Sequence, residues 1–209
     1  MQALIGRKIG MTRVYDDAGV QVPVTVVQVG PCTVVQRKSA QPDGYEAVQL
    51  GFEEQKESRL TKPQQGHFKK AGAKPAKVLR EVRLAAGEEA KAGDVLTAKI
   101  FEGVKFVDVL GHTKGRGFQG VVKRFKLGGG RASHGGGWMR RPGSIGGREE
   151  PGRIFRNKKL PGHMGSVNVT TQNLRVVKVL ADDHALLLEG AVPGPVGGIV
   201  LVRKAIKKA

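Results

Sequence analysis

The sequence predicts a mainly β protein, a barrel or a sandwich, that is interrupted by a long basic insertion rich in glycine. Runs of β-branched and aliphatic residues recur roughly every ten residues between Gly, Pro and Asp, which is typical of short strands in all-β folds. The 209 residues include 31 glycines, about twice the average share. Lys and Arg total 36 against 18 Asp and Glu, which gives a net charge of +18.

The first half of the chain contains a series of such runs. DDAG precedes the first run and PDG follows the second, and both are typical of turns. Residues 53–76 are polar and contain two prolines, so they predict either a short helix near residues 64–72 or a solvated connector with a basic face. The expected strands are residues 20–30, 32–38, 47–54, 77–84, 94–101 and 104–111.

The pattern of strands resumes after the insertion. The expected strands there are residues 166–172, 174–180, 184–192 and 199–205. The end of the chain, VRKAIKKA, is either a solvated basic terminus or a further contact to phosphate. We therefore expect a β-rich body, a barrel or a sandwich, of residues 1–110 and 166–209, in which residues 53–93 form a connector.

The composition excludes several classes of protein. Cys32 is the single cysteine, so neither an intramolecular disulfide nor a zinc site built from cysteines can form. Its β-branched neighbours favour a buried, unreactive thiol. No window approaches the roughly 18 to 20 apolar residues of a membrane span, and the N-terminus lacks the apolar region of a signal peptide. We expect a soluble, unexported, cytoplasmic protein with no membrane partner.

The basic charge is concentrated in residues 111–165, the glycine-rich segment. This segment contains sixteen glycines and thirteen Lys or Arg, but only two Glu, so its net charge is +11. Glycine lets the backbone approach a ligand closely, but it costs conformational entropy on ordering. The segment should therefore be disordered alone and ordered by a polyanion.

GRGFQG at residues 115–120 has the GxGxxG spacing of a dinucleotide-binding loop. That motif also requires a following helix and an acidic residue about 20 residues further on. Here VVKRFK runs straight into LGGGRASHGGG, and the first acidic residue is Glu149. We therefore expect no dinucleotide cofactor.

An enzyme is also disfavoured. None of the five histidines has the close spacing of a metal site. A catalytic triad in the glycine-rich segment would need a buried carboxylate, but Glu149 and Glu150 neighbour Arg148 and Arg153. The two glutamates either balance these guanidinium groups or contact RNA through metal ions or water. We expect no catalytic or metal-binding residue, no cofactor and no small-molecule substrate.

RNA is the polyanion that fits the segment best. Arginine binds phosphate with a planar fork, and aromatic residues spaced among the cations can stack on splayed bases. Trp138 either stacks in this way or packs against the protein's own barrel. DNA is less favoured, because the sequence has no helix-turn-helix, zinc-finger or basic-zipper pattern.

Three stretches carry a family resemblance: GRKIGMTRVYDDAG at residues 6–19, HTKGRGFQGVVKRF at 112–125 and RRPGSIGGREEPGRIFRNKKLPGHMG at 140–165. In this order, over essentially the whole chain, they resemble the bacterial form of the ribosomal protein L-three family of the large subunit. The resemblance implies that this body is a six-stranded translation-protein-type β-barrel, SH3-like and of the elongation-factor type, and that residues 53–93 form a small inserted subdomain. It also implies that residues 111–165 extend through rRNA towards the peptidyl-transferase centre.

The resemblance further implies the partners and the role of the protein. They are large-subunit rRNA and neighbouring large-subunit ribosomal proteins, with no homo-oligomer, and a role in nucleating assembly of the subunit. A non-ribosomal RNA-binding module or RNA chaperone is the alternative. Carried onto this chain, the expected rRNA-binding residues are Lys114, Arg116, Lys123, Arg124, Arg131, His134, Trp138, Arg140, Arg141, Arg148, Arg153, Arg156, Lys158 and Lys159, with Lys8 and Arg13 as weaker candidates.

Overall fold

The computed structural model describes residues 2–84, 88 and 90–208. The chain divides into two compact units. The barrel unit comprises residues 1–112 and 168–209, and the basic unit comprises residues 113–167. Each unit is described by itself below.

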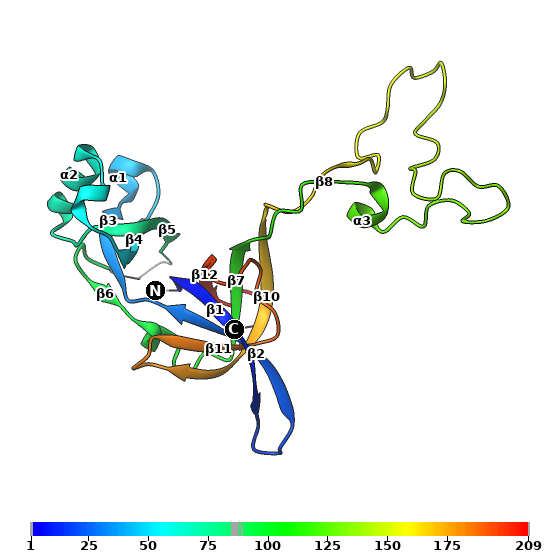
Figure 1. Ribbon diagram of the computed structural model, residues 1–209. Coiled ribbons are helices and arrows are strands. Elements are labelled where there is room, and N and C mark those ends of the chain that lie inside the picture. The colour runs from blue at the N-terminus through cyan, green and yellow to red at the C-terminus, as the bar shows by residue number, and fades with distance from the viewer. Residues whose placement is uncertain (1, 85–87, 89, 209) are drawn as a thin grey trace. The chain divides into compact units, whose positions relative to one another are not determined.

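Six antiparallel strands close into a barrel in the barrel unit (Figure 1). Their order around the barrel is β1-β12-β7-β10-β11-β2, so strands from both ends of the sequence lie side by side. The mainly β fold and the six-stranded barrel are therefore confirmed, and the sandwich is excluded. The strands are β1 (Ala3–Tyr15), β2 (Gln21–Val29), β7 (Phe106–His112), β10 (Asn168–Leu180), β11 (Ala185–Glu189) and β12 (Ile199–Lys204).

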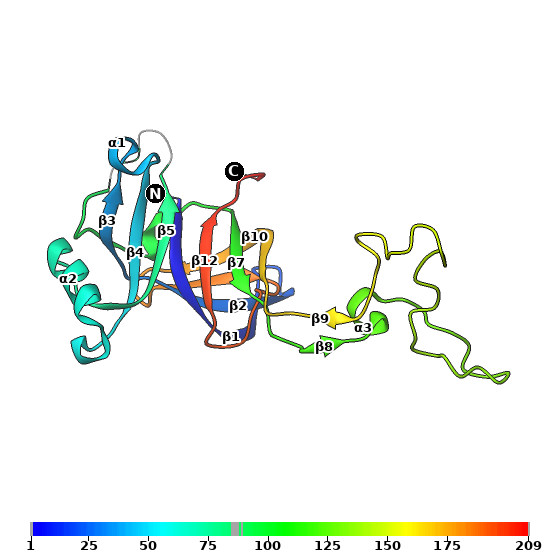
Figure 2. The same cartoon turned by 90° about the horizontal axis from the view of Figure 1, so that it is seen from above.

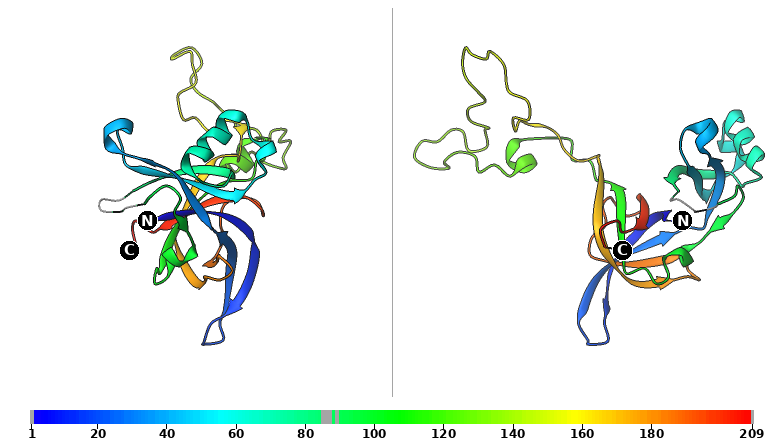
Figure 3. Two further views of the ribbon diagram at one scale, coloured as in Figure 1. Left: turned by 90° about the vertical axis from the view of Figure 1, so that its left-hand side faces the viewer. Right: turned by 180° about the vertical axis from the view of Figure 1, so that it is seen from behind.

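The hairpin of β1 and β2 extends beyond the other strands of the barrel (Figure 3, dark blue). Its turn forms where DDAG predicts one: the Asp16 carboxylate accepts hydrogen bonds from the backbone N–H groups of Ala18 at 3.1 Å and Val20 at 2.8 Å. β1 itself has no counterpart among the expected strands. Its alternation is broken by a bulge between Lys8 and Gly10, and most of its residues from Ile9 onwards are exposed.

β10 is one strand where the sequence predicts two. A bulge between Thr171 and Leu174 lets the strand continue, and Asn173 within it has a φ of 57°. The buried Asp108 carboxylate accepts a hydrogen bond from the Asn173 backbone N–H at 3.0 Å. Asp108, on the neighbouring strand β7, therefore stabilises a bulge at the place where the sequence predicts a break between two strands.

A second sheet has the strand order β5-β4-β3-β6. Two of its strands, β3 and β4, begin before the range 53–93 that is expected for the inserted subdomain. Residues 85–87 and 89 of that range lie outside the described residues. Residues 94–101, expected as one strand, form only the short β6 followed by a 3₁₀ turn. The elements are β3 (Cys32–Lys38), α1 (Ala40–Asp43), β4 (Ala47–Glu54), η1 (Glu57–Arg59), α2 (Lys62–Ala71), β5 (Ala76–Arg83), β6 (Val95–Leu96) and η2 (Ala98–Phe101).

Helix α2 decides between the two interpretations of residues 53–76 in favour of a helix. It begins with a capping box between Thr61 and Gln64, which satisfies backbone donors that the first turn leaves free, and it carries Pro63 in its first turn. Its Phe68 is buried. None of the helices in the described part of the chain is long and apolar enough to cross a membrane.

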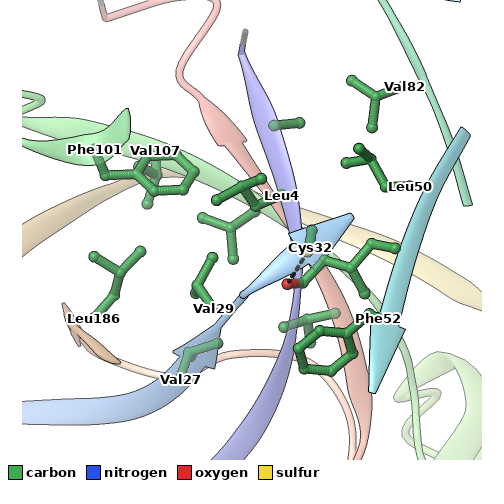
Figure 4. Close-up of a cluster of buried hydrophobic side chains, with 14 of the residues drawn as sticks. Leu4, Val27, Val29, Cys32, Leu50, Phe52, Val82, Phe101, Val107 and Leu186 are labelled. Carbon is green, nitrogen blue, oxygen red and sulfur yellow. Dashed lines mark hydrogen bonds between the residues drawn. The ribbon is translucent and has the colours of Figure 1, made fainter. Parts of the chain in front are cut away.

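One hydrophobic core joins the barrel to the second sheet (Figure 4). Leu4 and Val29 from the barrel and Leu50 and Phe52 from the second sheet belong to the same buried cluster. Cys32 lies among them with no exposed surface, and its thiol contacts the Ile5 carbonyl oxygen at 3.4 Å. The expected buried thiol is therefore confirmed.

Candidate nucleic-acid interface

Two antiparallel segments form the stem of the basic unit. The short strands β8 (Phe118–Gln119) and β9 (Gly162–His163) pair with each other (Figure 2). The ladder continues on one side, where the Arg116 N–H donates to the Met164 carbonyl at 2.9 Å. At its end the Thr113 N–H donates to the Val167 carbonyl at 2.9 Å. The two ends of the unit are thus held together by backbone hydrogen bonds.

Helix α3 (Val121–Phe125) follows the stem and packs on it. Val121 is buried, and the Arg124 guanidinium donates to the Leu160 carbonyl at 2.8 Å. A Cβ atom on Gly162 would lie 2.7 Å from that guanidinium, so the glycine leaves the room that Arg124 occupies. Arg124 therefore fastens the helix to the stem, and part of its hydrogen-bonding capacity is used inside the unit.

Trp138 lies against the backbone of its own segment. A Cβ atom on Gly130 would lie 2.6 to 2.9 Å from three carbons of the indole, so the ring covers the glycine in close contact. The Gly130 N–H donates to the Met139 carbonyl at 3.1 Å, which holds these two segments of the loop together. Trp138 nevertheless remains 49% exposed, so part of the indole is free to contact a partner.

The cations of the basic unit lie on its surface. Apart from the half-buried Arg124, every Lys and Arg between residues 113 and 167 is exposed, including Lys126, which the predicted set omits. His134 is exposed too, with a φ of 56°. The exposed residues of the predicted set are Lys114, Arg116, Lys123, Arg131, His134, Trp138, Arg140, Arg141, Arg148, Arg153, Arg156, Lys158 and Lys159.

Within the described residues, no ion pair neutralises any of these cations. Glu149 and Glu150 are exposed, and neither forms an ion pair with Arg148 or Arg153. Arg153 instead lies over the ring of Phe155, with its guanidinium carbon 5.7 Å from the ring centroid. The charge of the unit is therefore left for an external anion.

The two weaker candidates in the barrel unit differ in their surroundings. Arg13 is exposed on the β1–β2 hairpin. Lys8 is 7% exposed, and its ammonium group donates to the carbonyls of Val192 at 2.9 Å and Gly194 at 3.4 Å. The ammonium of Lys8 thus stabilises the loop before β12, which makes Lys8 the least available of the predicted contacts.

The glycines of GRGFQG belong to this stem rather than to a strand–helix crossover. A helix does follow them, but α3 has five residues and no acidic residue follows before Glu149. No group of three or more His, Cys, Asp or Glu among the described residues is arranged to hold a metal ion. What the geometry offers is a short stem that presents a cationic, partly aromatic loop.

Comparison with known proteins gives a consistent result. The sequence model of "Ribosomal protein L3" matches residues 61–185. Three relatives are each named "Large ribosomal subunit protein uL3". That of Heliobacterium modesticaldum is 50% identical over 206 residues, 99% of this chain and 98% of the relative. That of Pelobacter propionicus is 48% identical over 206 residues, 99% of both chains. That of Deinococcus radiodurans is 49% identical over 208 residues, 99% of this chain and 96% of the relative. Because these similarities span both units, the chain belongs to the ribosomal protein L3 family.

Proposed function

We propose that this protein is a structural component of the large ribosomal subunit in the cytoplasm, and that its basic unit binds large-subunit rRNA. Relatives 48 to 50% identical over nearly their whole length are named as proteins of that subunit. In this proposal the barrel body, residues 1–110 and 166–209 with the insert 53–93, docks on the subunit surface. The extension, residues 111–165, runs through rRNA towards the peptidyl-transferase centre.

The observation that carries the proposal is the unpaired charge of the glycine-rich segment. Its thirteen Lys and Arg against two Glu give +11, and the structure pairs none of these cations with an acid among the described residues. Such a density of like charge repels itself, and phosphate groups compensate it most effectively. Exposed Trp138 and Phe155 add surfaces on which unpaired bases can stack.

The proposed mechanism is binding and assembly rather than catalysis. The cations displace counterions from several rRNA segments, which gives most of the affinity, while glycine lets the backbone lie close to the sugar–phosphate chain. Because the extension brings separate rRNA segments together, its binding nucleates assembly of the subunit. Neighbouring ribosomal proteins are the further partners of the barrel body.

The test compares the whole protein with a variant in which residues 113–164 are replaced by a short Gly-Ser linker. Equilibrium binding is measured to large-subunit rRNA and to an unrelated RNA of equal length, at two salt concentrations. We expect the whole protein to prefer the rRNA, and the variant to lose both affinity and salt dependence. If both proteins bind both RNAs alike, the basic unit does not recognise rRNA, and a general RNA chaperone becomes the better interpretation.

A further inference from the structure

A cavity of about 560 Å³ lies in the barrel unit where β12 ends and β7 begins. It is lined by residues 103–106 together with Lys204, Ala205 and Lys208. Its volume falls within the range of roughly 300 to 1,000 Å³ that is usual for small-ligand sites. None of its residues belongs to the basic unit, so the proposed rRNA-binding segment does not account for it.

The barrel holds the walls of this cavity in place. β12 runs antiparallel to β7, with Lys204 opposite Val107, and the chain then continues into the C-terminal tail (Figure 2, red). The Ala205 N–H donates to the Phe106 carbonyl at 3.1 Å. On the other side of β7, the Val176 N–H donates to the Lys105 carbonyl at 2.9 Å. The backbone that carries the lining side chains is therefore fixed by hydrogen bonds on two sides.

The charged residues that line the cavity are all cations. Lys105, Lys204 and Lys208 are exposed, and none forms an ion pair with a described residue. By contrast, the cavity beside the β1–β2 turn is lined by Asp16 and Asp17 as well as by cations. Three ammonium groups around one opening, without a carboxylate in the lining, favour an anion.

Phe106 gives the cavity an aromatic wall. The ammonium nitrogen of Lys208 lies over this ring, 4.9 Å from its centroid, and both residues line the cavity. Lys208 covers this face in the free protein, so a base stacks on it only when the Lys208 side chain moves from the ring to the phosphate. Stacking of this kind tolerates any base. Val104 and Ala205 add apolar surface beside the ring.

We propose that this cavity binds one unpaired nucleotide of RNA, with the base on Phe106 and the phosphate held by Lys105, Lys204 and Lys208. An acidic peptide would use the ammonium groups but would leave the aromatic wall without a flat partner. A nucleotide combines a flat ring and an anion in one group, which matches both features. The inference rests on the proposed RNA partner, and it assigns the basic tail to a phosphate contact rather than to a solvated terminus.

The test follows backbone amide resonances of the isotopically labelled full chain by NMR during titration with adenosine 5′-monophosphate. We expect saturable shifts at residues 103–106 and 204–208. Phe106→Leu, which keeps an apolar side chain on β7, should weaken this binding roughly fivefold or more. Lys204→Gln should weaken it by a few fold, whereas the matched control Lys178→Gln, at another exposed lysine, on β10 and outside this cavity, should not.

The readout at separate residues distinguishes this proposal from the proposed function. If the nucleotide shifts only residues 113–167, the basic unit binds nucleotides and the cavity does not, which overturns the inference alone. The inference also fails if a hexaglutamate peptide shifts residues 103–106 and 204–208 as strongly as the nucleotide, since the site would then be one for an acidic protein segment. Unchanged affinity in both Phe106→Leu and Lys204→Gln would contradict the assigned contacts.

Discussion

Gly130 and Trp138 show how a single missing side chain can set the position of a binding residue. A methyl group at Gly130 would overlap the indole, so Gly130→Ala should displace Trp138 from its present place. We expect the affinity for rRNA to fall as it does in Trp138→Ala, by about 1 to 3 kcal/mol if a base stacks there. The dependence of affinity on salt should stay the same, because no cation is lost. Fluorescence of Trp138, the only tryptophan, reports the displacement in the same samples.

Gly128→Ala is the matched control for this prediction. A Cβ atom at Gly128 would meet no other atom within 4 Å, so the same chemical change leaves Trp138 in place. Its affinity should therefore stay close to that of the unchanged protein. Equal losses in Gly128→Ala and Gly130→Ala would mean that backbone freedom in the loop, rather than the position of the indole, controls binding.

Burial of Cys32 makes the stability of the barrel unit depend on pH. Burial raises the pKa of the Cys32 thiol to about 12, whereas an unfolded cysteine titrates near 8.5. The folded state thus keeps its proton when the unfolded state has lost it. The contribution to stability is complete below about pH 8.5 and is lost as pH rises towards 12, by up to about 1.4 kcal/mol per pH unit.

Urea unfolding of the protein and of Cys32→Ala under reducing conditions measures this contribution. The alanine variant has no thiol to ionise, so the difference in free energy of unfolding between the two proteins should shrink between pH 8 and pH 11. A difference that stays constant across this interval would show that the thiol titrates alike in the folded and unfolded chains.

At the scale of elements, the loop of the basic unit and the strands of the barrel should differ strongly in local stability. Residues 126–161 contain no helix or strand, and most of their side chains are exposed. We expect residues 128–150 of the free protein to exchange their amide hydrogens far faster than β2 or β11, and to become protected on binding rRNA. Protection in the free protein equal to that of the barrel strands would rule out ordering on binding. Hydrogen exchange followed by mass spectrometry makes the comparison.

The sequence predicts those strands in which apolar residues alternate or follow one another without interruption. β2, β11 and β12 are examples, because Val and Leu alternate or run together there and turns bound them. β1 is not predicted, since Gly6, Lys8 and Gly10 interrupt its pattern and its exposed half packs on no core. The bulge at Asn173 depends on Asp108, which is far away in the sequence. The local pattern around Asn173 therefore predicts two strands where β10 is one.

The same limit applies to the assignment of strands to sheets and to the candidate site. β3 and β4 have the same alternation as barrel strands, and only their pairing places them in the second sheet. The charge of the basic unit can be predicted from composition alone. The internal roles of Lys8 and Arg124, and the cavity around Phe106, depend on contacts between distant residues and leave no local signal.

For the whole molecule, the proposed function predicts a steep dependence of rRNA affinity on salt. If roughly six to ten phosphates are neutralised, the logarithm of the affinity should fall with the logarithm of the salt concentration at a slope of roughly 5 to 9. The net charge of +18 makes such a number of contacts available. Filter binding or fluorescence anisotropy over several salt concentrations gives the slope. A slope near one would mean that the charge of the basic unit is not used in binding.

Because β1 pairs with β12, the barrel cannot close until the last of its strands has been synthesised. Ala3 lies opposite Arg203, so β1, the first barrel strand in the chain, pairs with β12, the last barrel strand in the chain. During synthesis the basic unit leaves the exit tunnel before β10, β11 and β12, and thus before the barrel can close. The cations of the nascent chain are therefore accessible to nucleic acid while the apolar core of the barrel is still exposed. A chaperone that covers the basic unit or the exposed core at this stage would bind an intermediate that the strand order makes unavoidable.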